Sequence, residues 1–442
     1  MRVPQKGRLG QRVLRRGARG DDVVRLQSRL DEMGYRVGAN DGVYGYLLED
    51  AVRALQREHR LRPDGIAGAQ VVALLRDPEL NRRRRVHAVR PQEQLTEIAQ
   101  AYGVSVPALS LMNRLAPGRR LYAGQRLVIR NRIILGALHP ERIRHGLAWL
   151  GRQAELVSAV VAMWWRLDAS GALVADETEL PWDRLAELGV PVWAGVHSWH
   201  LDGSPTGGAI GLHGRRRRRL LEAVRELVRD GRIQGLLYDI GPLKLGDGGA
   251  LESAAAATAA FLKRPERPVY VVVPAERRGW FDDLDPAALA RSATRLVLGA
   301  HHVGGPGQSV AATERMIARM SRRVHPWRLL AGVPAPAYER IGDVWLPRDY
   351  AGGMASAYLK RRRPHWDAER LALHAEGVHE SLREDGEVES LPWELFVENS
   401  ETFRRRLLHL ELYNLDGLFM WRLGEDDPRA ATHIPRIVRV HR

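Results

Sequence analysis

Side chains that could exchange protons or hold a flat ligand stand just after several short apolar runs of the chain. Asp239 ends one such run, and His301 and Glu339 follow two others. Trp421 closes another run near the C-terminus. Carboxyl and imidazole groups can act as general acids or bases, and an indole ring offers a flat apolar face to a ligand. Whether these residues form one site depends on the elements that carry them.

From about Ile133 to the C-terminus, short apolar runs alternate with helical stretches. This alternation is typical of parallel βα units, and eight such strands predict an α/β TIM (β/α)8 barrel, whose mouth gathers side chains from several strands. The predicted strands are Ile133–Leu138, Leu156–Trp164, Val190–Val196, Ile233–Asp239, Val269–Val273, Leu296–Ala300, Leu329–Val333 and Gly417–Trp421. An α+β insertion is expected between the last two strands, at about residues 338–398.

The N-terminal segment, residues 13–78, has the pattern of three helices joined by two turns. Its turns read Asp41-Gly-Val-Tyr-Gly45 and Asp64-Gly-Ile-Ala-Gly68. Asp caps and tolerates tight turns, and Gly accepts a positive φ. The segment resembles the small three-helix peptidoglycan-binding domain of wall hydrolases, in which such turns frame a shallow groove.

Residues 85–130 have the pattern of a strand, two helices and a second strand. The ending Gly124-Gln-Arg-Leu127 and the helix that contains Ala99 and Tyr102 resemble a LysM domain, which implies binding of N-acetylglucosamine-containing glycans. The family usually has Gly-Asp-Thr-Leu at the first turn, whereas this chain has Gln92-Glu-Gln-Leu95. We expect the fold to persist, while sugar contacts from this loop stay open.

Residues 132–442 resemble the family-18 glycoside hydrolase barrel, particularly the spore-type branch that carries LysM repeats. The motifs that carry this resemblance are His301-His-Val-Gly-Gly-Pro-Gly307, Leu329-Leu-Ala-Gly-Val-Pro334 and Gly417-Leu-Phe-Met-Trp-Arg-Leu-Gly-Glu-Asp-Asp-Pro428. In that family a glutamate after the fourth strand donates a proton, and a nearby aspartate orients the substrate's own N-acetyl group as the nucleophile. The resemblance assigns the orienting role to Asp239 and places Gly241 where the acid would stand.

Other parts of the expected site also depart from the family pattern. At the sixth strand Ala300-His301 replaces a Tyr-Asp pair, while Tyr338 and Glu339 follow the seventh strand. The resemblance implies that Trp421 stacks on a sugar, and we expect Tyr238, His301 and Tyr338 to contribute to glycan binding. Glu339 or His301 is a candidate for a relocated acid. Asp239 as a plain core carboxylate and Trp421 as plain core packing stay open.

The composition limits the other functions that the chain could have. A net charge of +15 comes mainly from arginine, so any polyanion is attracted, although such runs also form ordinary solvated surfaces. No aromatic-rich RNA-binding or zinc-finger pattern is present, and we expect no nucleic-acid partner. The absence of cysteine excludes disulfides and thiolate sites. His197-Ser-Trp-His200 and His301-His302 lack an evident third ligand, so neither a metal nor a cofactor is expected.

The sequence favours a glycan-binding protein of the bacterial cell wall, with spore peptidoglycan or another N-acetylglucosamine-containing glycan as partner and anionic wall polymers as a further one. Without an acid at position 241, the barrel is expected not to hydrolyse. An active N-acetylglucosaminidase with a relocated acid and a structural spore-coat assembly protein are the alternatives. No export signal or membrane span is visible, which would suit a spore-envelope protein made in the mother cell.

Overall fold

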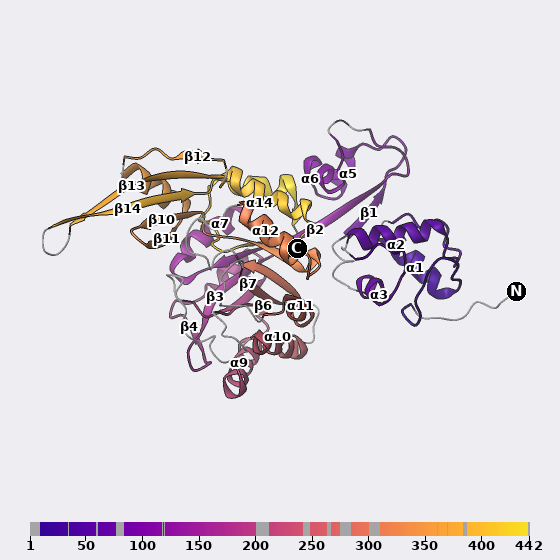
Figure 1. Ribbon diagram of the computed structural model, residues 1–442, viewed down its shortest axis with the longest axis horizontal. Coiled ribbons are helices and arrows are strands. Elements are labelled where there is room, and N and C mark those ends of the chain that lie inside the picture. The colour runs from indigo at the N-terminus through magenta and orange to yellow at the C-terminus, as the bar shows by residue number, and fades with distance from the viewer. Residues whose placement is uncertain are drawn as a thin grey trace. The chain divides into compact units, whose positions relative to one another are not determined.

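The computed structural model describes residues 9–440, apart from residues 34, 59–60, 77–83, 117, 119, 200–211, 242–247, 263–266, 275–283, 300–309, 360, 369 and 383–386. The chain divides into two compact units, residues 1–132 with 435–439 and residues 133–434 with 440–442. Figure 1 labels the elements of both units. In the described part of the chain, no helix has the length and apolar character needed to cross a bilayer.

The first unit begins with three helices, as the apolar spacing predicts. Their buried faces include Val23, Leu26 and Leu30 of the first helix and Val52 and Leu55 of the second. Apolar residues spaced three and four apart form one stripe on a helix, and here these stripes pack on one another. The helices are α1 (Asp21–Glu32), α2 (Tyr46–Glu58) and α3 (Ala69–Arg76).

A strand, two short helices and a second strand follow, in the predicted order. Ile98 and Leu109 of the helices pack against Leu127 and Ile129 of the second strand. The elements are β1 (Arg84–Ala88), α5 (Leu95–Ala101), α6 (Val106–Met112) and β2 (Arg126–Leu138). The first half of β2 pairs antiparallel with β1, and its second half is the first strand of the barrel.

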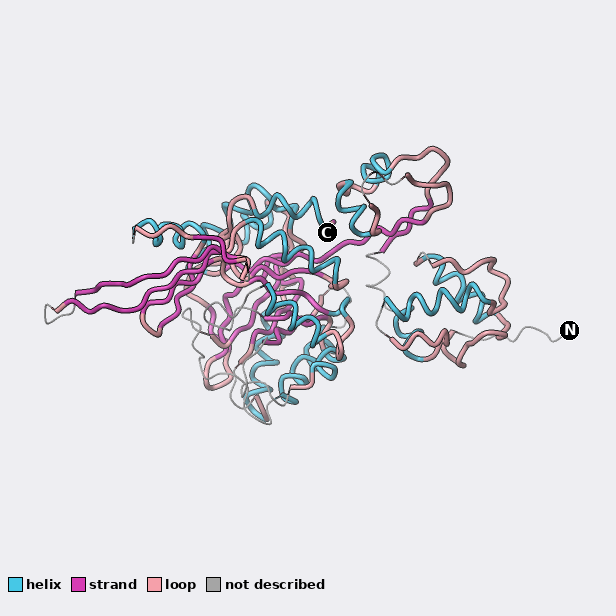
Figure 2. The backbone as a smooth tube through the Cα atoms, turned by 45° about the horizontal axis from the view of Figure 1, so that its top comes forward, coloured by secondary structure: helices cyan, strands magenta, loops and turns pink. Residues whose placement is uncertain are grey.

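Eight parallel strands form the closed barrel, which confirms the predicted fold (Figure 2). The ladder runs β2-β15-β9-β8-β7-β6-β5-β3 and closes through pairing of β2 with β3. A short strand, β4 (Leu173–Ala175), pairs antiparallel with the end of β3. The barrel strands after β2 are β3 (Ala159–Leu167), β5 (Val192–His197), β6 (Ile233–Asp239), β7 (Val269–Pro274), β8 (Arg295–Gly299), β9 (Leu329–Val333) and β15 (Gly417–Met420).

Alternate residues of the strands fill the barrel. Leu135, Val161, Leu237, Val272 and Phe419 belong to one buried cluster in its interior. Because successive side chains of a strand point to opposite faces, the residues between them face the surrounding helices. Those helices are α7 (Ile143–Gln153), α8 (Trp182–Glu187), α9 (Gly214–Leu227), α10 (Gly248–Leu262), α11 (Pro286–Ser292), α12 (Val310–Met320) and α14 (Ser400–Leu412), with α15 (Ile434–Ile437) and β16 (Arg439–Val440) at the end.

The α+β insertion lies between β9 and β15, as predicted. Its antiparallel sheet has the order β11-β10-β14-β13-β12, and Trp393, Leu395 and Ala357 pack together in its core. Figure 1 shows β13 and β14 running out beyond the other strands of this sheet. The elements are β10 (Ala337–Ile341), β11 (Val344–Arg348), α13 (Tyr350–Leu359), β12 (His365–Asp367), β13 (Ala372–Leu382) and β14 (Val388–Val397).

Candidate glycan-binding site

Three side chains share the interior face at the carboxyl ends of the barrel strands. His197 ends β5 and Asp239 ends β6, and the two are directly paired across these strands. Trp421, just after β15, packs against the interior cluster. Asp239 follows the inward-facing Leu237 by two positions, so the pleat of β6 directs its carboxylate inward as well. The strand ends therefore place a carboxylate, an imidazole and an indole on the interior face of the barrel.

Trp421 is only partly buried, and its ring is held by two aromatic neighbours. The imidazole of His139 meets it edge to face with ring centres 4.9 Å apart, and Phe419 lies below it at 5.8 Å. A nitrogen of His139 also lies 2.9 Å from the carbonyl oxygen of Trp421. These contacts fix the indole while leaving part of it accessible, which suits a stacking surface. The stacking role itself stays a prediction.

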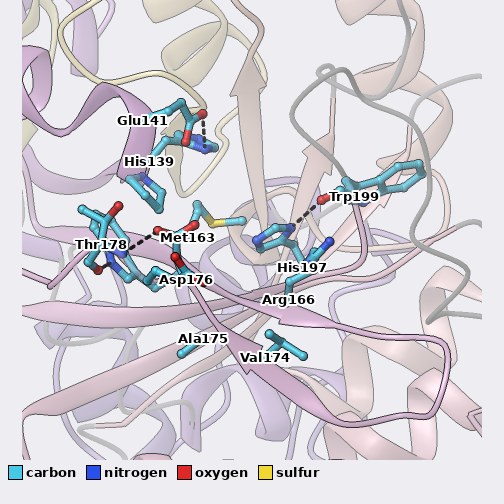
Figure 3. Close-up of a pocket in the computed structure, with 13 residues that line it drawn as sticks. His139, Glu141, Met163, Arg166, Val174, Ala175, Asp176, Thr178, His197 and Trp199 are labelled. Atoms are coloured by element: carbon cyan, nitrogen blue, oxygen red, sulfur yellow. Dashed lines mark hydrogen bonds and ion pairs between the residues drawn. The ribbon is translucent and has the colours of Figure 1, made fainter.

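A pocket of about 550 Å³ opens at the ends of β2, β3 and β5. Figure 3 shows His139 and Glu141 from the loop after β2 facing Arg166 of β3 and His197 of β5. Asp176 and Glu177, which follow β4, complete its polar wall. The pocket combines cationic, anionic and aromatic groups, so it can hydrogen-bond a polar ligand as well as stack on it.

Two ionisable groups of the pocket, Glu141 and His197, have shifted pKa values. Burial raises the pKa of Glu141 above its ordinary value, although about a third of the side chain, 31%, stays exposed. Burial lowers the pKa of His197, although the nearby Asp239 opposes this shift. Burial therefore favours the protonated form of Glu141. Glu141, His139 and Arg166 carry no sequence signal beyond a position at or after the end of a strand, so no spacing pattern predicts them as site residues.

The backbone at Gly241, where the family acid would stand, is fastened by Ser198. The N–H of Gly241 donates to the Ser198 hydroxyl oxygen at 2.8 Å, and that hydroxyl donates to the carbonyl of Gly241 at 2.5 Å. Both residues are buried. The loop after β6 is thus held through its main chain, with no titratable side chain at this position.

Glu339 does not fit the role of a relocated acid, so that expectation is corrected. Its side chain is only 3% exposed and accepts hydrogen bonds from Trp393 at 2.7 Å and Arg348 at 3.0 Å, and from the Ser356 hydroxyl. Burial alone would raise the pKa of Glu339, but the bonds from Ser356, Trp393 and Arg348 outweigh it and hold the pKa below its ordinary value. Glu339 is an ionised carboxylate that joins β10, β11, α13 and β14.

Tyr238 does not reach the mouth either, and its predicted glycan contact is corrected. Because Leu237 faces the interior, the pleat of β6 turns Tyr238 outward, where its hydroxyl lies 2.7 Å from that of Thr258 in α10. Tyr238 is fully buried there. Tyr338, on β10, is 8% exposed, and burial raises its pKa to about 12. His301 lies outside the described residues.

A second carboxyl with a raised pKa lies in the loop after β15. Burial, with help from the neighbouring acids Glu398 and Glu425, raises the pKa of Asp426 to about 8. Asp426 does not line the pocket described above. In the described part of the chain, no three His, Asp or Glu side chains gather as metal ligands would.

The two turns of the helical domain have the same internal bonding. In the first, the buried side chain of Gln27 bonds Asp41 at 2.9 Å and accepts from the N–H of Gly42 at 2.9 Å. In the second, Gln56 bonds Asp64 at 2.7 Å and accepts from the N–H of Gly65 at 2.8 Å. Each aspartate also accepts the N–H two residues ahead. Because the same bonds occur in both turns, we infer that they are a structural feature of this domain.

The unusual first loop of the second small domain is ordered by its own polar residues. Gln92 has a φ of 65°, in the left-handed region that favours glycine. Glu93 bonds the imidazole of His87 at 2.7 Å and the N–H of Arg90 at 2.8 Å, and the N–H of Gln94 donates to Glu97. The replacement loop therefore keeps a turn at the position where the family has glycine.

Comparison with known proteins identifies the small domains. Residues 19–75 match the family model of a peptidoglycan binding domain, and residues 87–130 match that of the LysM domain. A spore cortex-lytic enzyme of Bacillus cereus is 44% identical over 63 residues, which cover 14% of this chain and 24% of that protein. The chain thus spans about a quarter of this curated relative.

Solved structures identify the fold of the larger unit. The spore cortex-lytic enzyme SleL of Bacillus megaterium aligns with a TM-score of 0.58 at 14% identity, covering 88% of this chain and 96% of that one. A chitinase of Chromobacterium violaceum aligns with a TM-score of 0.57 at 19% identity, covering 69% and 98%. The chain therefore joins a peptidoglycan-binding domain and a LysM domain to a barrel with the fold of SleL and of this chitinase.

Proposed function

We propose that the protein binds the glycan of the bacterial cell wall, in particular spore peptidoglycan, and that its barrel holds the glycan without hydrolysing it. The two small domains support binding to peptidoglycan and to N-acetylglucosamine-containing glycans. The name of the curated relatives, spore cortex-lytic enzymes, supports the spore wall as the setting. Joining several weak glycan sites in one chain raises the local ligand concentration, so the whole chain gains avidity.

The proposal that the barrel does not hydrolyse depends on one observation, the glycine at position 241. Substrate-assisted cleavage of a glycosidic bond needs a proton donor at the leaving oxygen, and glycine has no group that can supply it. Loss of a general acid lowers a rate by about 10² to 10⁴. The ionised, fully bonded carboxylate of Glu339 offers no replacement. The partly exposed Trp421 remains as a surface on which a sugar can stack.

Two measurements on the purified full chain test this proposal. It should cosediment with insoluble spore-cortex peptidoglycan at moderate salt, and muropeptide analysis after long incubation should find no new reducing ends. Failure to cosediment would exclude glycan binding as the function of the protein. Release of new reducing ends would show that the barrel hydrolyses the glycan, and the proposal of glycan binding would still stand.

A second candidate function is hydrolysis through Glu141, and one observation favours it. Glu141 lines the pocket, and burial raises its pKa, as a general acid requires. If reducing ends are released, Glu141→Gln should lower the rate by about 10² to 10⁴, since it removes the acid and keeps the shape. Glu177→Gln is the matched control, because Glu177 lines the same pocket. Equal rates in both variants would exclude Glu141 as the acid.

A further inference from the structure

The outer part of the insertion sheet is a ribbon of only two strands. β12 pairs with residues 372–374 of β13, and β10 pairs with residues 393–397 of β14. Beyond these limits, β13 and β14 pair with each other out to Leu382 and Val388. Figure 2 shows this ribbon projecting past the remaining strands of its sheet. We call residues 376–382 and the facing residues 388–394 the ribbon, and its outer part, residues 378–382 and 388–392, pairs with no third strand in the described part of the chain. An isolated two-stranded ribbon is only marginally stable in water. A ribbon of this length is therefore expected to have a function, such as contact with another surface.

One face of the ribbon alternates carboxylates with exposed aliphatic side chains. Along β13 the exposed residues are Glu376, Val378, Glu380 and Leu382, and Val388 lies directly opposite Leu382. The exposed fractions are 55% for Val378, 74% for Leu382 and 63% for Val388. Polar residues would be expected on a strand face that always meets water, so this mixed face has the character of a contact surface.

The same unit carries a surface of opposite charge at the start of α9. Arg215 to Arg219 are consecutive, and Arg215, Arg218 and Arg219 share one helix face because they are spaced three and four apart. Arg215 and Arg218 are exposed. The first turn of α9 has no acidic residue and no side-chain cap. Cations at a helix N-terminus oppose its dipole, so this turn lacks the anions that would stabilise it.

The two surfaces match in chemistry. Arginine offers an aliphatic stem as well as a charge, so arginines can cover Val378 and Leu382 while reaching Glu376 and Glu380. Two ribbons placed together would instead bring like charges into contact.

We propose that the ribbon of one molecule docks on the arginine face of α9 in a second copy of this chain. Since the ribbon and α9 are different surfaces, the contact is head to tail and leaves one free surface of each kind at the ends of an assembly. Such contacts extend into open chains unless the geometry closes a ring. The proposal concerns assembly and does not depend on the glycan site.

The wild-type full chain, treated with nuclease, should show this association in sedimentation velocity. At low ionic strength the mean sedimentation coefficient should rise with protein concentration, and about 0.5 M salt should reduce the association because it screens surface charges. A single concentration-independent monomer peak at low salt would overturn the proposal.

Charge reversal identifies the two surfaces. One variant carries Glu376→Arg and Glu380→Arg, and the other carries Arg215→Glu and Arg218→Glu. Each alone should associate about 100-fold more weakly, because like charges then face each other. Equal amounts of the two variants should associate again, since each contact then joins opposite charges. Restoration in the mixture is a result that misfolding cannot produce.

The remaining outcomes also decide the question. Association lost with the helix reversal and kept with the ribbon reversal would mean that α9 acts through another polyanion, and the proposal would fail. Loss with the ribbon reversal alone would exclude α9 as the partner surface. Cosedimentation with peptidoglycan measures glycan binding separately, so failure of assembly and failure of the proposed function remain distinguishable.

Discussion

The helical domain and the barrel mouth use buried polar side chains in different ways. In the helical domain, Gln27 and Gln56 bond turns that lie within 20 residues of them along the chain, and the same motif occurs twice. At the barrel strand ends, Asp239, His197 and Trp421 come from segments far apart in sequence. Local motifs can keep their bonding as a unit, whereas a long-range site loses its chemistry when one member changes. We predict that the barrel mouth, with Asp239 but with glycine at position 241, is such a case.

The largest expected effect is loss of stability on replacing Glu339. Glu339→Gln removes the charge that Arg348, Ser356 and Trp393 bond, and loss of the hydrogen bonds to this buried charged group should cost up to about 3 kcal/mol of unfolding free energy. Glycan binding should not change. Denaturant unfolding and cosedimentation measure the two effects, and Glu376→Gln, at an exposed position of the same sheet, is the control. Reduced glycan binding at unchanged stability would show that Glu339 belongs to the glycan-binding site after all.

The same variant should change the acid sensitivity of the protein. Because the pKa of Glu339 is depressed in the fold, its stabilising contribution is present above the unfolded pKa of about 4.3 and is lost as pH falls through the folded value. The stability gap between wild type and Glu339→Gln should therefore be constant above about pH 5 and shrink below pH 4. A gap that widens on acidification would contradict the depressed pKa.

A somewhat smaller effect is expected at the repeated turn. Gln56→Ala removes bonds to Asp64, to the N–H of Gly65 and to the carbonyl of Ile66, which should cost about 2 kcal/mol. Hydrogen exchange of residues 61–67 should accelerate accordingly. Gln70→Ala, at an exposed position of α3, should leave it unchanged. Equal exchange in both variants would show that the glutamine does not hold the turn.

Replacing the indole at the mouth should weaken glycan binding by about tenfold, as expected for the loss of one aromatic stacking contact. The change is Trp421→Ala, and isothermal titration of the full chain with a tetramer of N-acetylglucosamine measures binding, so the difference between wild type and variant reports the barrel component. Trp366→Ala, which removes a partly exposed indole from β12, is the matched control. Unchanged affinity in Trp421→Ala would show that Trp421 only packs in the core and does not stack on a sugar.

The smallest effect is expected in the loop that departs from the LysM pattern. Gln92 adopts a φ of 65°, which costs a side chain of this kind about 1 kcal/mol. Gln92→Gly should relieve this strain, and after the entropy of glycine in the unfolded chain a gain of about 0.5 kcal/mol remains. Thermal unfolding measures it, with Gln100→Gly in α5 as a destabilised control. Loss of stability in Gln92→Gly would mean that the glutamine makes a compensating contact.

Most of the fold followed from the sequence because its signals are periodic. All eight barrel strands, the helical domain and the insertion were predicted, since apolar runs and turn residues recur at regular spacing. The direction of Tyr238 could also have been foreseen from the pleat once Leu237 was placed inside. By contrast, Glu339 is bonded by Ser356 and Trp393, which are 17 and 54 positions away. No spacing rule identifies such partners, or the pocket position of Glu141.

The two hydrogen bonds between Ser198 and the main chain of residue 241 have an evolutionary consequence. Both of its bonds go to backbone atoms, so a different residue there could retain the same two bonds. Glycine and glutamate codons differ by a single nucleotide when they end in A or G. A single point mutation of such a glycine codon would place a carboxyl group at this position, next to a main chain that Ser198 holds.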